Sequence, residues 1–298
     1  MADPTTSLRE DARDALRLAG PSVVRIGRAP GRGNGVVVAE GAVLTNAHNL
    51  RDRTTEVTFA DGRSVQGEVL GADPDGDLVV LSVDTAGAPV AVWSDVEAEP
   101  GDVVFAVARR EDGGERVSHG LVSGVGRGFR GPRGRPITGS LEHTAPLARG
   151  SSGSPVVDRT GRLVGLSTAR LADGFYLARP ADEELRDLVA QLLRGESRHR
   201  LALGVGLAPA EVARELRTSV GLPDQPGLLV RGVAAGSPAA AAGIAVGDLL
   251  VAAADAPLTT VEVLHEALDA ARTTRVLTLV VLRGTEERSV EVVFPPES

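Results

Sequence analysis

Short strand-like runs, separated by turns along most of the chain, constrain the fold more than any other feature of this sequence. Asp61-Gly62 between two of them is a strong hairpin signal. The first set of runs lies at 23–26, 35–38, 43–45, 56–59, 64–70 and 78–83, and the second at 90–93, 102–108, 116–125, 137–144, 155–157, 163–167 and 174–178. With 36 glycines and 18 prolines available for turns, this spacing predicts a mainly β region of two six-stranded barrels.

Between the runs at 137–144 and 155–157, the sequence Arg-Gly-Ser-Ser-Gly-Ser-Pro at residues 149–155 places a serine between glycines. A serine hydroxyl is a poor nucleophile near neutral pH, so it needs a neighbouring base and backbone N–H donors aimed at the oxyanion it creates. Gly150 and Gly153 permit the tight backbone of such a site. We interpret the segment as a nucleophile turn with Ser152 at its centre; the alternative is a surface loop rich in Ser and Gly.

Two candidate partners for this serine lie upstream. His48 ends a short strand-like run and could take a proton near pH 7 and return it to a leaving group. Asp77 directly precedes a buried-looking strand, where a carboxylate could orient the imidazole; Asp75 is the second choice. Taken alone, a histidine such as His48 is more often structural, and an aspartate such as Asp77 is more often a turn residue before a strand. Together they follow the order His48, Asp77, Ser152, which is that of chymotrypsin-type proteases.

The blocks that carry these residues resemble the catalytic blocks of the HtrA/Deg family of trypsin-like serine proteases. They read T-N-A-H at 45–48, D-P-D-G-D-L-V-V-L at 73–81 and G-S-S-G-S-P at 150–155. The resemblance covers about residues 20 to 180. It implies a chymotrypsin-like double β-barrel with the site in the cleft between the barrels. It also implies an oxyanion hole formed by the backbone N–H groups of Gly150 and Ser152.

The last hundred residues resemble a PDZ domain, an α+β fold, of the same family. The turn at Leu203, Gly204 and Val205 is similar to its carboxylate-binding turn, and residues 236–250 to its central block. Gly204 would let N–H groups converge on a terminal carboxylate, and the following strand would pair with an added peptide strand. A helix over 260–271 would form the other wall. The alternative for Leu203 and Val205 is plain core packing.

These patterns divide the chain into four parts. Residues 1–21 form an N-terminal helix and lead-in, residues 22–181 the protease domain, residues 182–200 a helix and linker, and residues 201–298 the PDZ domain. Apolar spacing predicts the first helix over 7–19, and we expect it to pack against the first barrel. Relatives that form trimers commonly use aromatic contacts from this segment. No aromatic residue precedes Phe59, so a homo-oligomer is possible but a trimer is in doubt.

Composition excludes several classes of function. A formal net charge of −8 argues against nucleic acid as the main partner, and the absence of cysteine excludes disulfides, thiol nucleophiles and Cys-based zinc sites. We expect no cofactor, no metal and no membrane span, because no run of 18 apolar residues exists. The start lacks the pattern of a secretory signal, which favours the cytoplasm, whereas the family favours the cell envelope or the outside.

The most basic stretch, at residues 126–136, is rich in Arg, Gly and Pro. A nucleic-acid tract is one interpretation. We favour a mobile surface loop, too rich in Gly and Pro to be a stable strand, at the place of the family's activation sensor loop.

Two serines also depart from known patterns. Ser151 replaces the aspartate that pairs with a freed N-terminus in digestive relatives, and Ser154 stands where the family usually has glycine, so it could crowd the site or point to solvent.

The resulting hypothesis is a serine endopeptidase that acts on unfolded or damaged proteins in quality control. We expect its PDZ domain to bind hydrophobic C-termini and to raise activity through the loop at 127–138. The specificity pocket should be lined partly by residues 144–147 and 166–168, none acidic, which favours small or medium apolar side chains. The alternative is a catalytically weak peptide-binding scaffold or chaperone.

Overall fold

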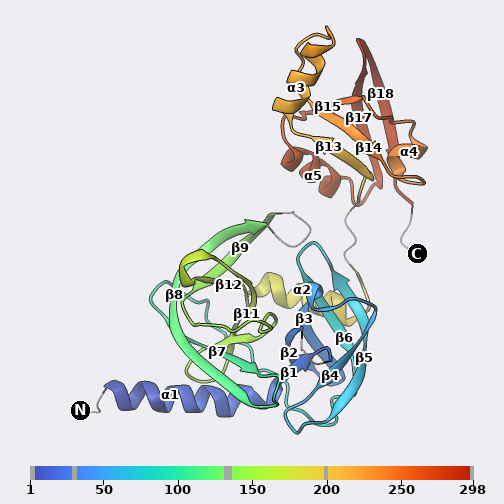
Figure 1. The fold of residues 1–298 in the computed structure, drawn as a ribbon. Helices are drawn as coiled ribbons and strands as arrows, with labels where there is room; N and C mark the ends of the chain where they lie inside the picture. The colour runs from blue at the N-terminus through green and yellow to red at the C-terminus, as the bar shows by residue number, and fades with distance from the viewer. Residues whose placement is uncertain (1–3, 29–31, 131–135, 198–200, 296–298) are drawn as a thin grey trace. The chain divides into compact units, whose positions relative to one another are not determined.

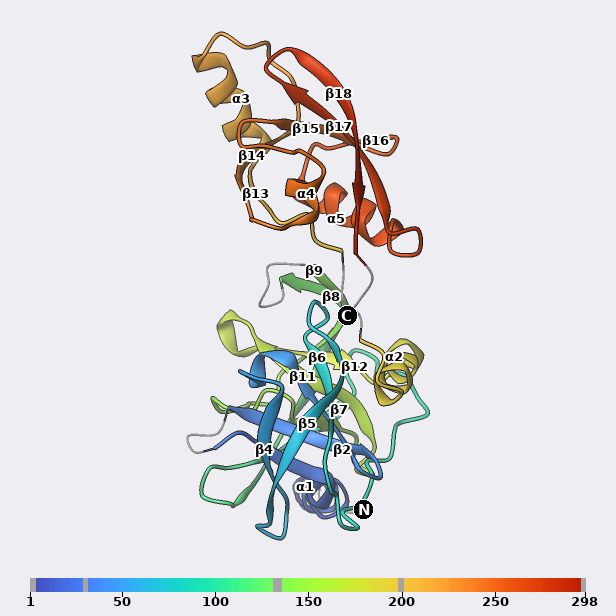
Figure 2. The same cartoon turned by 90° about the vertical axis from the view of Figure 1, so that its right-hand side faces the viewer.

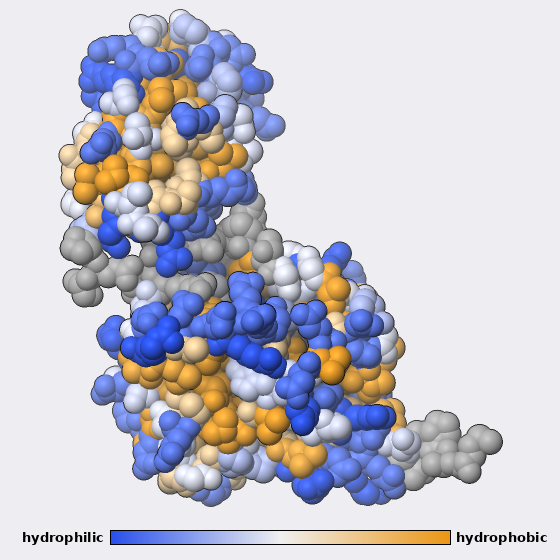
Figure 3. All heavy atoms as spheres, turned by 180° about the vertical axis from the view of Figure 1, so that it is seen from behind, coloured by the Kyte–Doolittle hydropathy of each residue, from blue (hydrophilic) through white to orange (hydrophobic). Residues whose placement is uncertain are grey.

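The computed structural model describes residues 4–28, 32–130, 136–197 and 201–295. The chain forms two compact units, Met1–His199 and Arg200–Ser298, called here the first and second units. Figures 1 and 2 show the first unit as two barrels with helices at their surfaces, and the second as one curved sheet with helices beside it. Figure 3 shows hydrophobic side chains at the surface of both units, interrupted by hydrophilic ones, as is usual for globular proteins.

The first barrel closes from six strands in the order β1-β2-β3-β6-β5-β4. Its strands are β1 (Val23–Ile26), β2 (Gly33–Ala39), β3 (Ala42–Asn46), β4 (Thr54–Thr58), β5 (Ser64–Asp73) and β6 (Leu78–Ser82). Their inward side chains, such as Ile26, Val43 and Leu81, are fully buried. Closure leaves no open sheet edge, and it fixes the ends of β3 and β6 side by side, because Asn46 pairs with Leu78.

The second barrel also closes from six strands, in the order β10-β11-β12-β9-β8-β7. They are β7 (Val103–Arg109), β8 (Glu115–Arg130), β9 (Pro136–His143), β10 (Pro155–Val157), β11 (Leu163–Arg170) and β12 (Tyr176–Pro180). The strand expected at 90–93 is wrong. Ala91 N–H donates to Val37 O of the first barrel and Leu163 N–H to Val92 O of this segment, so the segment bonds to both barrels instead of joining one ladder.

The loop expected at 126–136 is also wrong over part of its length. β8 runs on to Arg130 and β9 begins at Pro136, so both ends of the basic stretch are strand; residues 131–135 lie outside the described residues. Arg127 pairs with Ser140 and Phe129 with Ile137. The glycines are accommodated by shifts of register on both sides of Arg127, as β-bulges allow.

Two long helices cover the barrels. α1 (Pro4–Ala19) packs small side chains such as Ala15 against Phe105 and Val157, so it lies on the second barrel and not on the first as expected. Phe105 and Val157 are core residues of that contact and need an apolar cover. Arg109 fastens the end of the helix: its guanidinium donates to Gly20 O at 3.0 Å and to Val23 O at 2.6 Å.

α2 (Glu183–Leu193) closes the first barrel. Its first N–H groups are capped by Asp182, whose carboxylate accepts from Leu185 N–H at 2.9 Å. Leu188 and three neighbouring apolar residues of the helix are buried with residues of β2, β3 and β6. The helix end lies so close to β5 that a Cβ at Gly71 would stand 2.4 Å from Leu192 O, which explains the glycine there. The described part of this unit also contains three short 3-10 helices: η1 (Gly20–Ser22), η2 (Ala47–Asn49) and η3 (Ala172–Gly174).

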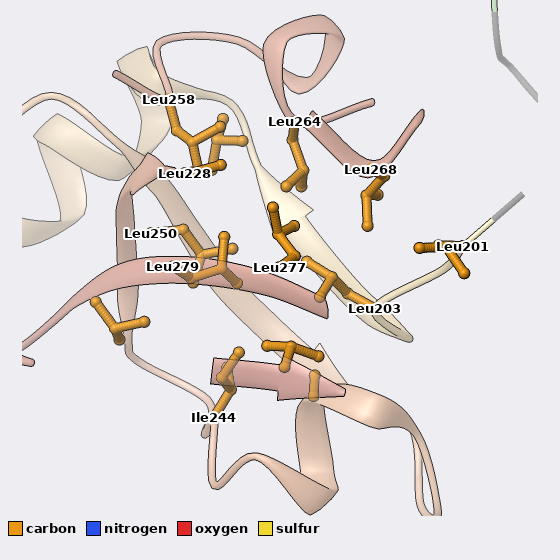
Figure 4. Close-up of a cluster of buried hydrophobic side chains, with 14 of the residues drawn as sticks. Leu201, Leu203, Leu228, Ile244, Leu250, Leu258, Leu264, Leu268, Leu277 and Leu279 are labelled. Carbon is orange, nitrogen blue, oxygen red and sulfur yellow. The ribbon is translucent and has the colours of Figure 1, made fainter. Parts of the chain in front are cut away.

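The second unit is a sheet of order β13-β14-β15-β17-β18, with β16 beside β15. Its elements are β13 (Val205–Ala208), α3 (Ala210–Ser219), β14 (Leu228–Val233), α4 (Pro238–Ala241), β15 (Leu249–Ala253), β16 (Ala256–Pro257), α5 (Val261–Ala270), β17 (Val276–Arg283) and β18 (Glu286–Val293). Figure 4 shows Leu264 and Leu268 of α5 pointing toward Leu277 and Leu203 in the core. The expected helix over 260–271 is present, whereas α3 was not anticipated.

Candidate active site

Ser152 lies in a tight turn just before β10. Gly150 and Gly153 both have left-handed backbones, with φ of 77° and 84°. Gly153 N–H donates to Ser167 O at 2.7 Å, which fastens the turn to β11. A Cβ at Gly153 would stand 2.1 Å from Asn34 O, so both the φ angle and the close approach require glycine.

His48, which follows β3, and Asp77, which precedes β6, are in contact at the adjacent ends of these two strands. The two atoms His48 Nδ1 and Asp77 Oδ2 are 2.7 Å apart, and His48 N–H donates to Asp77 Oδ1 at 3.0 Å. Because a carboxylate can only accept, Nδ1 carries the proton and Nε2 is left as the basic nitrogen. The imidazole is 31% exposed and the carboxylate 2%, so the base can meet a substrate while the acid cannot.

The backbone of Asp77 is itself held in place. Its φ of 58° is unusual for a residue other than glycine and costs of order 1–3 kcal/mol. Its carbonyl accepts from Ala47 N–H and from the Asn46 side chain, each at 3.1 Å. Thr168 of the second barrel donates to Asp77 Oδ2 at 3.1 Å, a further bond that fixes the carboxylate. The acid in contact with the imidazole is Asp77, the first choice of the two aspartates.

Two asparagines that sequence reasoning missed tie the serine turn to the first barrel. Asn34 Nδ2 donates to Gly150 O at 3.1 Å, and Asn49 Nδ2 donates to Ser152 O at 2.9 Å. Asn34 N–H also donates to Ser152 O at 2.7 Å. Asn49 directly follows His48, so these bonds join the turn of Ser152 to the segment that carries the imidazole. A signal existed in the sequence: the chain has only three asparagines, and all lie within residues 34–49.

A pocket of about 130 Å³ opens beside Ser152. It is lined by Leu147, Ala148, Arg149, Gly150, Ser151, Ser152, Ser167, Thr168, Ala169, Arg170 and Tyr176. The expected lining is therefore only partly right. Residues 144–146 are absent from it because Thr144 bonds to β8 at Leu121 N–H and Ala145 is packed against Gly120. Leu166 is buried instead in the core beneath α2. Neither Asp nor Glu lines the pocket.

Ser154, the departure from the family pattern, is fully buried, so it does not point to solvent. Its Oγ has no hydrogen-bond partner among the described residues. The backbone around it is regular, because its N–H donates to Ser151 O at 3.0 Å and its carbonyl accepts from Ser167 N–H at 2.9 Å. The larger side chain is thus absorbed inside the barrel without opening the turn.

A larger pocket of about 770 Å³ lies elsewhere in the first unit, between the segment 94–100 and the start of α2. It contains none of the three candidate catalytic residues. Within the described residues, no three His, Cys, Asp or Glu side chains gather as metal ligands would. Among the described helices, none combines the length and apolarity needed to cross a bilayer.

In the second unit, the turn predicted to bind a carboxylate lies just before β13. Gly204 has a φ of 76°, and a Cβ there would stand 2.3 Å from the Ser237 side chain, so glycine is required. Leu203 is buried and its carbonyl accepts from Ala239 N–H at 3.0 Å. Val205 pairs with Val233 of β14, which is the one neighbour of β13 in the sheet order of the described strands. Leu203 therefore does serve the core, and the other edge of β13 is open for pairing.

Known proteins share both the sequence and the fold of this chain. A trypsin-like peptidase domain family matches residues 33–166, and a PDZ domain family matches residues 229–283. The putative serine protease HhoB of Synechocystis is 29% identical over 89% of this chain and 66% of its own length. A probable periplasmic serine endoprotease DegP-like of Brucella suis is 31% identical over 82% of this chain and 49% of its own length.

Solved structures agree. The serine endoprotease from Yersinia pestis, 26% identical, has a TM-score of 0.67 and covers 95% of this chain and 96% of its own. The HtrA-type protease AlgW with decapeptide, 23% identical, also has a TM-score of 0.67 and covers 96% of this chain and 99% of its own. The chain belongs to the HtrA family. The predicted family and the double barrel followed by a PDZ domain are thereby confirmed, and this HtrA-family chain spans about two thirds and about half the length of the two curated relatives.

Proposed function

We propose that this HtrA-family chain is a serine endopeptidase whose catalytic residues are His48, Asp77 and Ser152. The observation that carries the proposal is the 2.7 Å contact between His48 Nδ1 and Asp77 Oδ2, beside a serine turn that is bonded to the residue after His48. This arrangement supplies an exposed base, a buried acid that orients it and a nucleophile on a turn fixed by two glycines.

The reaction would proceed in two halves. Ser152 Oγ attacks the peptide carbonyl while His48 Nε2 takes its proton, and the N–H groups of Gly150 and Ser152 hold the oxyanion. His48 then gives the proton to the leaving amine, and an acyl-enzyme remains. Water repeats the sequence on the acyl carbon and releases the second product. Asp77 stays ionised throughout and stabilises the imidazolium that forms in each half.

Labelling with a fluorophosphonate tests this assignment. Wild-type protein should be labelled at one serine and should cleave unfolded protein, and Ser152→Ala should lose both properties. Ser151→Ala is the matched control, because it removes the neighbouring hydroxyl and should keep the label. Labelling that survives in Ser152→Ala would show that another residue is the nucleophile.

The pocket favours small or medium apolar side chains at the cleaved residue. Its lining includes Leu147 and Tyr176 and two arginines, Arg149 and Arg170, and it lacks the carboxylate that would attract a basic side chain. Cleavage after arginine should therefore be slow compared with cleavage after valine or alanine in matched peptides. Efficient hydrolysis of the arginyl peptide would contradict this specificity.

The PDZ domain, which we place at residues 201–298 of the second unit, is proposed to bind hydrophobic C-termini. Gly204 would allow N–H groups near Leu203 and Val205 to converge on a carboxylate, and the open edge of β13 would accept an added strand. AlgW, a structural relative, is described with a decapeptide. Unfolded or damaged proteins would be the substrates, in the manner of quality control, and relatives named as periplasmic suggest the cell envelope as the place of action. The scaffold alternative is not favoured, because these relatives are named as proteases.

A further inference from the structure

We propose that Asn34 and Asn49 are positioning residues that hold the oxyanion hole of Ser152 in its working shape. The inference rests on the proposed function, since it takes the N–H groups of Gly150 and Ser152 as the oxyanion donors. Each of these two residues has its own carbonyl held by a side-chain amide from the first barrel: Gly150 O by Asn34 and Ser152 O by Asn49. The pair is called here the amide clamp.

The orientation of the Asn49 amide follows from its surroundings. Ser152 O can only accept, and the Thr45 hydroxyl already donates to Asn34 O at 2.5 Å, so Thr45 Oγ1 must accept from Asn49 at 2.9 Å. Both partners therefore require the Nδ2 donors. Asn49 Oδ1 is buried without a hydrogen-bond partner in the described part of the chain, which is costly. We infer that the Asn49 side chain is tolerated despite this cost because its two N–H donors bind Thr45 Oγ1 and Ser152 O.

The clamp is built into the interior of the protein. Asn34, Thr45 and Asn49 are all fully buried, and Arg109 N–H donates to Asn34 Oδ1 at 2.6 Å, which orients the second amide as well. A Cβ at Gly33 would stand 2.2 Å from the Asn49 amide, so a glycine leaves the room that this side chain fills. Donors buried in this way are fixed before substrate arrives, as oxyanion stabilisation requires.

The clamp acts on catalysis and not on ground-state binding. Gly150 and Ser152 are residues whose N–H groups meet the developing charge, whereas neither asparagine lines the substrate pocket. The N–H group and the carbonyl of one residue lie in adjacent peptide units that meet at its Cα. Releasing the carbonyls of Gly150 and Ser152 therefore lets these residues change φ and ψ and turns their N–H groups away from the oxyanion, which weakens contacts made in the transition state. Such a change lowers kcat and leaves KM nearly unchanged.

The test replaces Asn49 by leucine, which has a similar shape and no donor. Ser152 O keeps its bond from Asn34 N–H and Thr45 keeps its bond to Asn34 O, so the fold should persist. Activity is divided by the number of serines titrated with a fluorophosphonate. We expect kcat per titrated site to fall about 10- to 100-fold, less than the loss of an oxyanion donor itself, with KM changed less than about twofold.

A peptide boronic acid, which mimics the tetrahedral intermediate, should bind more weakly to Asn49→Leu by the same factor as kcat falls. Asn49→Ser, a smaller polar change, should give the same result. Thr85→Val is the control, because it removes a buried acceptor of Gly41 N–H in the same barrel and touches no residue of the site. It should keep the wild-type kcat per titrated site.

Two results would overturn the proposal, and they differ. If both Asn49 variants keep the wild-type kcat per titrated site and the wild-type boronate affinity, the positioning role of the clamp is refuted. The catalytic assignment would be unaffected by that result. If Ser152 of the wild-type chain takes up no label, both the proposed function and the positioning role of the clamp are refuted.

Discussion

At the scale of single residues, His143 is a buried base that the proposed reaction does not use. It lies at the end of β9, fully buried, stacked on Tyr176 with ring centroids 5.7 Å apart. Neither ring nitrogen has a hydrogen-bond partner among the described residues. Burial lowers the pKa of His143 from 6.5 to about 4, because the charged imidazolium cannot be solvated there.

This shift predicts how stability depends on pH. Between pH 4 and 6.5 the unfolded chain binds a proton at His143 that the folded chain does not bind, so the free energy of unfolding should fall as the pH is lowered through that window. The loss approaches about 3 kcal/mol near pH 4. Urea unfolding from pH 4 to 7 measures it, with His143→Leu as the comparison. The variant should show a flatter dependence over the same window, and equal slopes in both proteins would contradict the assignment.

At the scale of elements, α2 illustrates a helix that stabilises by burial. Leu188 is almost fully buried against the first barrel. Leu188→Ala removes that side chain and leaves a cavity, which should lower the free energy of unfolding by about 2–5 kcal/mol. Asp187→Ala, on the exposed face of the same helix, should change it by less than about 0.5 kcal/mol. Chemical denaturation of the two variants checks this, and equal losses would show that the helix is not a cover for the barrel core.

Most strands could be predicted from the sequence because short runs of apolar, often β-branched residues are separated by turn residues. The segment 90–93 is also such an apolar run, but it bonds to two different barrels, so it forms no ladder. The strand ends near Arg127 were missed for the opposite reason, since glycine and proline conceal a ladder that bulges make possible. The predicted packing of α1 was wrong because its apolar stripe would suit either barrel, and residues of the second barrel such as Phe105 and Val157 are the ones it covers.

The candidate site was predictable to the extent that its chemistry lies in side chains. His48, Asp77 and Ser152 stand in compact blocks of unusual composition, and their roles stay a prediction until the labelling experiment is done. The amide clamp was hidden because Asn34 and Asn49 contact backbone carbonyls 116 and 103 positions away. Every residue has a carbonyl, so the grouping of the three asparagines within residues 34–49 does not reveal which carbonyls they bind.

At the scale of the whole molecule, the remaining prediction concerns regulation. A hydrophobic peptide with a free C-terminus should raise cleavage of a small reporter peptide by the full chain. A coupling of about 1–3 kcal/mol, or 5- to 150-fold, is ordinary between two sites. The proposed relay is the region 127–138, of which residues 131–135 lie outside the described residues; it is proposed because it resembles the family's sensor loop in its place along the sequence.

The control for this experiment is the same peptide with an amidated C-terminus, which should neither bind tightly nor stimulate. A chain ending near residue 198 should cleave the reporter without responding to either peptide. If the free peptide binds and turnover stays constant, the second unit only tethers substrates, and the regulatory proposal fails.

The amide clamp also determines when the protein can become active during its synthesis. Asn34 and Asn49 belong to the first barrel, and the carbonyls they hold belong to the second. A ribosome-bound chain that has completed only the first barrel carries the histidine and the aspartate but no nucleophile. A chain whose barrels have both folded but not docked has the serine without its fixed oxyanion donors. Under the proposed mechanism, full proteolytic activity therefore appears only after the two barrels have docked, which would spare the nascent chain from cleavage by its own site.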